Sequence, residues 1–97
     1  MASNPSFPIG TASVSWTDSG GTHLRVYVTD GYNVTERCFD NNAWTTGGFS
    51  AKGGQVSATV WQESEVRIRV YCTFEDACIE YCSDGGGAWY QGGFTVS

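Results

Sequence analysis

Basic residues and histidine are scarce in this chain. Five Lys and Arg stand against ten Asp and Glu, which gives a formal net charge of -5, and His23 is the single histidine. Nucleic acids bind basic patches that release counterions from the phosphates, so this charge balance argues against a nucleic-acid partner. The four cysteines lack the paired CxxC spacing of a zinc ribbon. We therefore expect no metal and no cofactor.

Long apolar runs are also missing. No segment approaches the roughly 20 apolar residues that a membrane-spanning helix needs. The first residues, Met-Ala-Ser-Asn-Pro, contain neither the basic nor the apolar region of a signal peptide. The sequence predicts a soluble chain without membrane insertion and without an export signal at its start.

Proline is rare, with two residues, whereas glycine is abundant, with 13, and aromatic residues make up 14% of the chain. β-branched and aromatic side chains suit a pleated sheet, and glycine suits the tight turns between short strands. A chain of 97 residues has room for one domain with a modest core. We expect an all-β protein.

An internal repeat organises the sequence. Within residues 13–49 and 57–94, SVSW matches SATVW, HLRVY matches RIRVY, VTERCFD matches CIEYCSD, and AWTTGGF matches AWYQGGF. The offset is 44 residues at Arg25 and 45 residues at Trp44, because one residue is inserted in the second copy within Gly85-Gly86-Gly87.

Each copy contains four short segments of strand character, separated by turn residues such as Asp30-Gly31 and Asn41-Asn42. A repeat of about 40–50 residues with four strands is typical of a propeller blade. Two blades cannot close a ring and leave sheet faces open, so we expect the chain to assemble into a symmetric ring. The expected boundaries are an N-terminal extension at 1–12, blade 1 at 13–49, a connector at 50–56 and blade 2 at 57–97.

Each copy carries an Arg that is followed 11 residues later by a Glu, namely Arg25 with Glu36 and Arg69 with Glu80. One interpretation is a cross-strand ion pair on the surface, worth about 0.2–1 kcal/mol. The other is a sugar site, because a pyranose offers hydroxyls to a guanidinium and a carboxylate, and an apolar face to an aromatic ring.

Aromatic residues that stand one strand further on favour the sugar site. They are Phe39, Trp44, Trp89 and Tyr90. We expect the other repeated aromatic side chains to pack in the core, namely Trp16, Trp61, Phe49 and Phe94.

The repeats resemble a known family. RVY followed by TERC, the pair FD, and W-x-T-G with a small residue before Phe are similar to the fucose-binding lectins of Aleuria type. The likeness extends in particular to the short two-blade bacterial members, such as the Ralstonia lectin, and covers roughly residues 13–97. It implies a homotrimer that forms a six-bladed propeller, with sites for fucose and fucosylated oligosaccharides between adjacent blades.

The resemblance also implies two kinds of site. In the first, Arg69 and Glu80 of one chain meet Phe39 and Trp44 of another chain, two aromatic residues that keep the spacing of five typical of the family. Arg and Glu hold the sugar, and the aromatic pair stacks on it. This site has its full set of residues.

The second site combines Arg25 and Glu36 with Trp89 of the same chain, but its stacking position falls on Ser83, and the inserted glycine extends the spacing to six. We expect this site to be weaker or altered, unless Tyr90 replaces the lost ring. In both sites the family often has a small residue that borders the sugar, here Gly48 and Gly93.

The cysteines form two pairs of different character. Cys38 and Cys82 are equivalent in the repeat, and we expect them to be buried and unpaired. Cys72 and Cys78 are expected to face one another across a hairpin, which leaves a disulfide between them as an open alternative.

Two other functions compete with sugar binding. Glycoside hydrolases use two carboxylates about 5–9.5 Å apart, and each blade offers one such pair, Glu36 with Asp40 or Glu80 with Asp84. Catalysis needs one acid and one base with different pKa values. A pair that occurs once in each blade would give two catalytic centres in one short chain, which is unusual, so we do not expect an enzyme. The alternative is a non-catalytic scaffold for protein interaction. We predict a multivalent fucose-binding lectin, which acts at extracellular glycans or stays in the cytoplasm.

Overall fold

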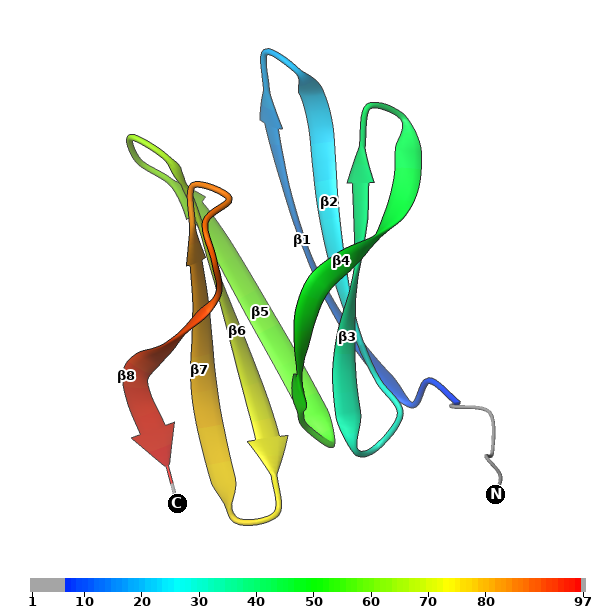
Figure 1. The fold of residues 1–97 in the computed structure, drawn as a ribbon, viewed down its shortest axis with the longest axis vertical. Coiled ribbons are helices and arrows are strands. Elements are labelled where there is room, and N and C mark those ends of the chain that lie inside the picture. Colours follow the sequence, from blue (N-terminus) through cyan, green and yellow to red (C-terminus); the bar gives the residue numbers. More distant parts are fainter. Residues whose placement is uncertain (1–6, 97) are drawn as a thin grey trace.

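The computed structural model describes residues 7–96, which form eight strands in two antiparallel four-stranded sheets (Figure 1). We call these sheets blade 1 and blade 2, and the all-β prediction with two four-stranded blades is confirmed. None of the described residues belongs to a helix that could cross a membrane. The strands are β1 (Gly10–Asp18), β2 (Gly21–Thr29), β3 (Asn33–Asp40), β4 (Ala43–Lys52), β5 (Gln55–Gln62), β6 (Val66–Phe74), β7 (Ala77–Asp84) and β8 (Tyr90–Val96).

Each blade is a simple meander in which every strand pairs with the next one along the chain. The turn between β3 and β4 has Asn41 and Asn42 at φ values of 53° and 62°. This left-handed backbone is the conformation that a two-residue hairpin turn requires, and asparagine tolerates it better than most residues. The turn predicted at Asn41-Asn42 is therefore present.

The strands extend beyond the expected boundaries of the repeats. β1 begins at Gly10, inside the expected N-terminal extension, whose residues 1–6 lie outside the described part of the chain, as does Ser97. β4 continues to Lys52 and β5 begins at Gln55, so most of the expected connector is strand and only Gly53-Gly54 joins the blades. Strand pairing uses the backbone, so it continues where the side chains no longer repeat.

The two blades use their faces in the same way. One face of each sheet carries Arg25 or Arg69, and we call it the arginine face; the other carries Trp44 or Trp89, and we call it the tryptophan face. The two sets separate because successive residues of a strand point to opposite faces.

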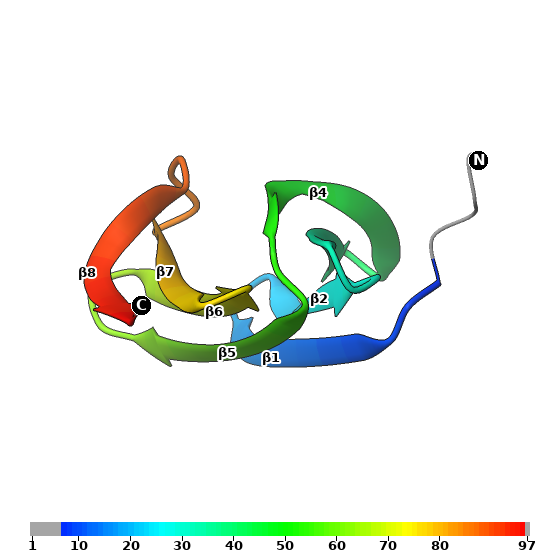
Figure 2. The ribbon, with the colours of Figure 1, turned by 90° about the horizontal axis from the view of Figure 1, so that it is seen from below.

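The arginine face of blade 1 packs on the tryptophan face of blade 2. The Phe49 ring lies 4.6 Å from the Trp89 ring and 5.4 Å from the Tyr81 ring, measured between centroids. Tyr27 meets Trp89 edge to face at 6.1 Å. Strands β1 and β5 also contact each other, and Figure 2 shows them along one side of the molecule. The contact between unlike faces forms the core between the blades.

Among the described residues, no sheet packs against the arginine face of blade 2. Tyr71 and Phe94 form the same edge-to-face pair as Tyr27 and Phe49, at 5.7 Å against 5.6 Å. Nevertheless Phe94 is 48% exposed, whereas Phe49 is 4% exposed. The prediction of core packing is confirmed for Phe49. Within one chain it is wrong for Phe94 and for Trp61, which is 40% exposed, because no blade covers the face on which these two residues lie.

Replacing Phe49 with Ala is expected to destabilise the fold by about 3–5 kcal/mol, the usual cost of truncating a buried aromatic side chain. Urea denaturation followed by tryptophan fluorescence measures this change. Thr46→Ala on the exposed part of the same strand is the control, with an expected change within about 0.5 kcal/mol. Equal stability of the two variants would contradict the assignment of Phe49 to the core between the blades.

Candidate functional site

A cavity of about 320 Å³ lies between the two blades. Blade 1 contributes Arg25, Glu36 and Gly48 to its lining, and blade 2 contributes Trp89, from the segment before β8, together with Ser83. The structure thus gathers in one hollow all four residues that the sequence assigned to the site within a chain, and it places Ser83 beside them.

Arg25 lies on β2 and is held by blade 1 itself. Its Nη1 donates to Asp40 Oδ1 at 3.1 Å and to the Leu24 carbonyl at 2.8 Å, and its guanidinium lies 4.9 Å from the centre of the Trp16 ring. In the strand register Arg25 stands opposite Cys38, so Glu36 is a diagonal neighbour on the same face. Asp40 is the other diagonal neighbour, and Arg25 forms its ion pair with Asp40.

Glu36 lies on β3 and is fixed by groups of the core between the blades. Its side chain is 4% exposed, and it accepts hydrogen bonds from the Tyr27 hydroxyl at 2.8 Å and from the Phe49 N–H at 3.3 Å. Burial, followed by the nearby Glu36 charge, raises the pKa of Tyr27, so the phenol keeps its proton and remains a donor. The carboxylate is thus held in place at the wall of the cavity.

Blade 2 repeats this arrangement on its open arginine face. Arg69 Nη1 donates to Asp84 Oδ1 at 2.9 Å, and the guanidinium lies 4.9 Å from the centre of the Trp61 ring. Glu80 accepts a hydrogen bond from the Tyr71 hydroxyl at 2.7 Å. The second set of predicted polar residues therefore has the geometry of the first, without an opposing blade.

Phe39 and Trp44 lie on the tryptophan face of blade 1, which points away from blade 2. Their rings form a tilted pair with centroids 5.2 Å apart, and Trp44 is 55% exposed. Within one chain they do not meet Arg69 and Glu80. Their meeting in a second chain remains a prediction, as does a role for Gly93 of β8 beside them.

Ser83 and Tyr90 differ from the aromatic residues expected at a stacking position. Ser83 is 6% exposed, and its Oγ donates to the Gly87 carbonyl at 3.2 Å. The Tyr90 hydroxyl donates to Asp84, on the opposite face of blade 2. Tyr90 therefore does not replace the missing ring in the cavity.

Sequence reasoning missed the residues that hold the arginine and the glutamate. A Cβ atom on Gly47 would lie 2.0 Å from Glu36 Oε1, whereas a Cβ atom on Gly48 would meet nothing within 4 Å. Only Gly47 thus has to be glycine for the carboxylate to fit. The signal that could have found these supports is their repetition in both copies: Tyr27 and Tyr71, Asp40 and Asp84, Gly47 and Gly92.

The cysteines contribute no covalent link. Cys38 and Cys82 are buried and free, which confirms the prediction for this pair. The expectation that Cys72 and Cys78 face one another was wrong, because Cys72 pairs with Ile79 and Cys78 pairs with Thr73. The hairpin turn leaves the two thiols on opposite faces of the sheet, and both are free. Burial, with a smaller contribution from Cys78, raises the pKa of Cys72 to about 11.

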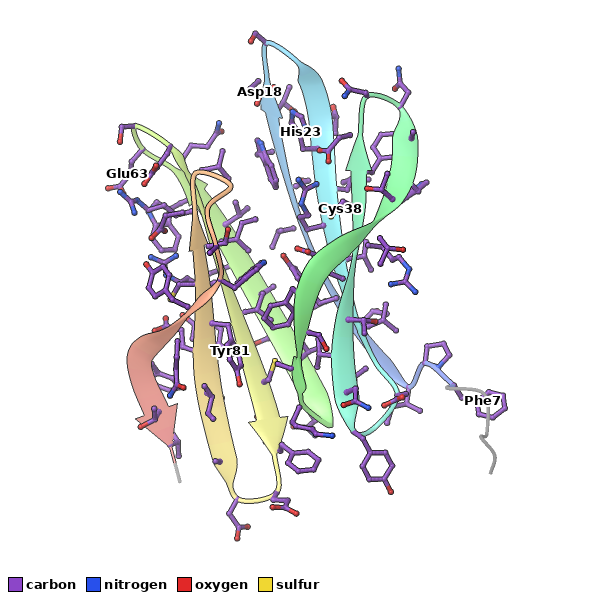
Figure 3. The ribbon with its side chains drawn as sticks, viewed as in Figure 1. Phe7, Asp18, His23, Cys38, Glu63 and Tyr81 are labelled. Carbon is purple, nitrogen blue, oxygen red and sulfur yellow. The ribbon has the colours of Figure 1, made fainter. Side chains whose placement is uncertain are left out.

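A charged cluster next to Arg25 contains the single histidine. His23 Nδ1 lies 2.5 Å from Asp40 Oδ1, His23 Nε2 lies 2.9 Å from Asp18 Oδ1, and the imidazole stacks on Trp16 at 5.2 Å. The hydrogen bond to Asp40, followed by the one to Asp18, raises the pKa of His23. Figure 3 shows Asp18 and His23 together near the end of the β1–β2 hairpin.

Blade 2 has an arginine in place of this histidine. Arg67 pairs with Glu63 at 2.7 Å and with Asp84 at 3.2 Å, and Figure 3 shows Glu63 at the corresponding end of the β5–β6 hairpin. Hydrogen bonds from Tyr90 and then from Arg69 lower the pKa of Asp84 to about 2. Each blade thus holds its arginine through an equivalent aspartate, Asp40 or Asp84. The further partner of this aspartate is a histidine in blade 1 and an arginine in blade 2.

The two repeated four-stranded blades, with an arginine, a glutamate and a tryptophan gathered in the hollow between them, define the class of β-propeller proteins. A family model described as "Fungal fucose-specific lectin" matches residues 11–97, and the chain belongs to this family. The resemblance inferred from the repeats is thereby confirmed. A search of curated proteins found no match.

Gly47→Ala is expected to destabilise the protein by about 1–3 kcal/mol, because the new methyl group overlaps the Glu36 carboxylate and forces it to move. Gly48→Ala is the matched control, since its methyl group enters open space. Chemical denaturation of the two variants measures the difference. Equal stabilities would show that the carboxylate is not confined by Gly47.

The stability of the protein is expected to fall as pH rises through the pKa of His23. A folded-state pKa raised above the ordinary histidine value of 6.5 means that the folded state favours the proton, so the stabilisation is complete below that value and is lost above the raised pKa. The unfolding temperature measured between about pH 6 and 8 reports this loss. This pH range lies below the one in which free thiols titrate, so the cysteines do not contribute to the change.

His23→Arg, which copies Arg67 of blade 2, provides the control for this pH dependence. The variant is expected to keep its charged partners and to show a flatter profile over the same range. A profile identical to that of the unmodified protein would exclude His23 as the titrating group. The single histidine also allows its pKa to be read directly by NMR titration.

Proposed function

We propose that the protein is a multivalent lectin that binds fucose and fucosylated oligosaccharides without chemically changing them. The observation that carries this proposal is the cavity between the blades, in which Arg25, Glu36 and Trp89 converge from two sheets. Membership of the fucose-specific lectin family supports fucose as the sugar.

The chemistry of the cavity suits a neutral sugar ring. Arg25 uses Nη1 for Asp40 and Leu24, and a guanidinium has further N–H groups to offer to hydroxyls or the ring oxygen. Glu36 accepts hydroxyl donors, and charge-assisted hydrogen bonds of this kind are stronger than neutral ones. Trp89 supplies an aromatic surface and an indole N–H. Because their partners position Arg25 and Glu36 beforehand, the sugar does not have to order them.

The open faces of the chain support assembly into a ring. Blade 2 exposes an arginine face and blade 1 exposes a tryptophan face, and within the chain faces of these two kinds already pack together. A contact between unlike faces is heterologous, and repeating it produces a closed ring when the rotation allows. We propose a homotrimer of six blades, in which Trp44 of one chain packs on Tyr71 and Phe94 of the next.

The same contact would complete the second kind of site. Arg69 and Glu80 would then face Phe39 and Trp44 of the adjacent chain, with Gly93 beside them. Several sites on one ring gain avidity through their high effective concentration, which favours ligands that are dense on a surface.

The state of the carboxylates argues against hydrolysis. Burial raises the pKa of Asp40, but hydrogen bonds from His23 and Arg25 outweigh this effect and leave the pKa below its ordinary value. Asp40 therefore stays ionised and is no proton donor, and Asp84 is in the same condition. The other member of each pair, Glu36 or Glu80, uses both carboxylate oxygens to accept hydrogen bonds from a tyrosine hydroxyl and a backbone N–H. A glycoside hydrolase needs one carboxyl group that keeps its proton until it reaches the leaving group.

Methyl fucoside is expected to bind with a stoichiometry of more than one site per chain, and Arg69→Ala is expected to weaken binding more than Arg25→Ala. The reason is that only the Arg69 site has both aromatic partners. Isothermal titration calorimetry measures the binding, and light scattering on the same samples measures the mass of the assembly. Lys52→Ala, an exposed cation at the end of β4, is the control.

Four results would contradict this proposal or a part of it. A chain that binds no sugar at any concentration would favour a scaffold for protein interaction, and release of free fucose from an aryl fucoside would indicate an enzyme. Equal losses in the two arginine variants, or the reverse order, would remove the ranking of the sites. A stable single protomer in dilute solution would exclude the ring.

A further inference from the structure

The two repeats differ most at one wall of the sugar site. Arg, Glu, Tyr and Asp are the same in both copies, but Phe39 of blade 1 corresponds to Ser83 of blade 2. The turn that follows Ser83 also contains the inserted glycine within Gly85-Gly86-Gly87. The cavity within the chain is therefore bordered by a serine and a glycine turn where the other site has an aromatic ring.

The glycine turn is an ordered wall. Gly85 and Gly86 have φ values of 62° and 79°, a backbone that favours glycine. The Gly85 N–H donates to the Val66 carbonyl at 2.7 Å, and the Gly87 N–H donates to the Asp84 carbonyl at 3.0 Å. Ser83 lies beneath this turn with its hydroxyl on the Gly87 carbonyl. Gly86 and Gly87 themselves line the cavity.

A wall of glycine backbone binds a ligand differently from an aromatic ring. Its Gly86 N–H and its carbonyl oxygens can bind hydroxyls, whereas the N–H groups of Gly85 and Gly87 already donate within the blade. It has no flat apolar surface on which the C–H groups of a sugar can stack. Across the cavity, Gly48 also leaves open space, since a Cβ atom there would meet nothing within 4 Å. The site therefore favours a ligand with additional hydroxyls over an isolated deoxy sugar.

We propose that the site between the two blades of one chain recognises fucose together with the sugar residue linked to it, whose hydroxyls contact the turn Ser83 to Gly87. The site that contains Phe39 and Trp44 recognises terminal fucose alone by stacking. This inference rests on the proposed function, and it makes Ser83 and the glycine turn the residues that determine ligand size.

The test compares methyl fucoside with a panel of fucosyl disaccharides that differ only in linkage. Arg69→Ala serves as the background that isolates the site within the chain, and Arg25→Ala isolates the other site. In the Arg69→Ala background at least one disaccharide is expected to bind about tenfold more tightly than methyl fucoside, the effect of one additional well-placed contact. In the Arg25→Ala background the two kinds of ligand are expected to bind within about threefold of each other.

A second substitution in each background tests the wall itself. Ser83→Phe in the Arg69→Ala background is expected to remove the preference for the disaccharide. Phe39→Ser in the Arg25→Ala background is expected to weaken methyl fucoside binding by about tenfold without creating a preference for the disaccharide, because no glycine turn is present there. Light scattering verifies the assembly of every variant.

Each outcome has a defined meaning. Equal affinity of all ligands in the Arg69→Ala background overturns the inference, and this result does not depend on whether Ser83→Phe folds. If a folded Ser83→Phe variant retains the preference for the disaccharide, the role of the wall is overturned. If the unmodified protein binds neither methyl fucoside nor any disaccharide, the proposed function itself fails, which is a distinct result.

Discussion

The packing of the arginine face of blade 1 against the tryptophan face of blade 2 is the contact on which the other features of the structure depend. Phe49 and Tyr27 bury their rings against Trp89 and Tyr81. This contact forms the core of a small chain, and the hollow that it leaves beside the core is the candidate site. Because two unlike faces meet, each chain keeps one face of each kind open. One kind of contact therefore forms the core and borders the candidate site, and in the proposed ring it would also join the chains.

Stability and binding geometry are linked through the same residues. Tyr27 packs in the core between the blades while its hydroxyl holds Glu36, and the backbone of Phe49 donates to the same carboxylate. Gly47 leaves the space that the carboxylate occupies. A buried carboxylate without such donors would be costly, so the core that covers Glu36 also has to satisfy it. The site is thus part of the core and not an addition to its surface.

The two copies have kept the centre of the site and diverged around it. Arginine, glutamate and their tyrosine and aspartate partners occur in both, with matching distances. The differences lie at the periphery, where His23 corresponds to Arg67 and Phe39 corresponds to Ser83. Duplication therefore provides two similar sets of polar residues, which are the centres of the two proposed sites, in surroundings that differ in titration behaviour and in the shape of one wall.

The sequence by itself determined the all-β class, the two blades and the residues at the centre of the proposed site, because strand periodicity and a duplicated pattern are local properties that neighbouring residues carry. It did not reveal that Asp40 and not Glu36 pairs with Arg25, that Cys72 and Cys78 point to opposite faces, or that Phe49 is buried while the equivalent Phe94 is exposed. Strand register decides the second, because a shift of one residue reverses the face of every side chain. Register leaves Glu36 and Asp40 as equal diagonal neighbours of Arg25, and the first is decided by the Tyr27 hydroxyl and the Phe49 N–H, which bind Glu36. The third depends on which face another blade covers, a property of the packed sheets that no residue carries alone.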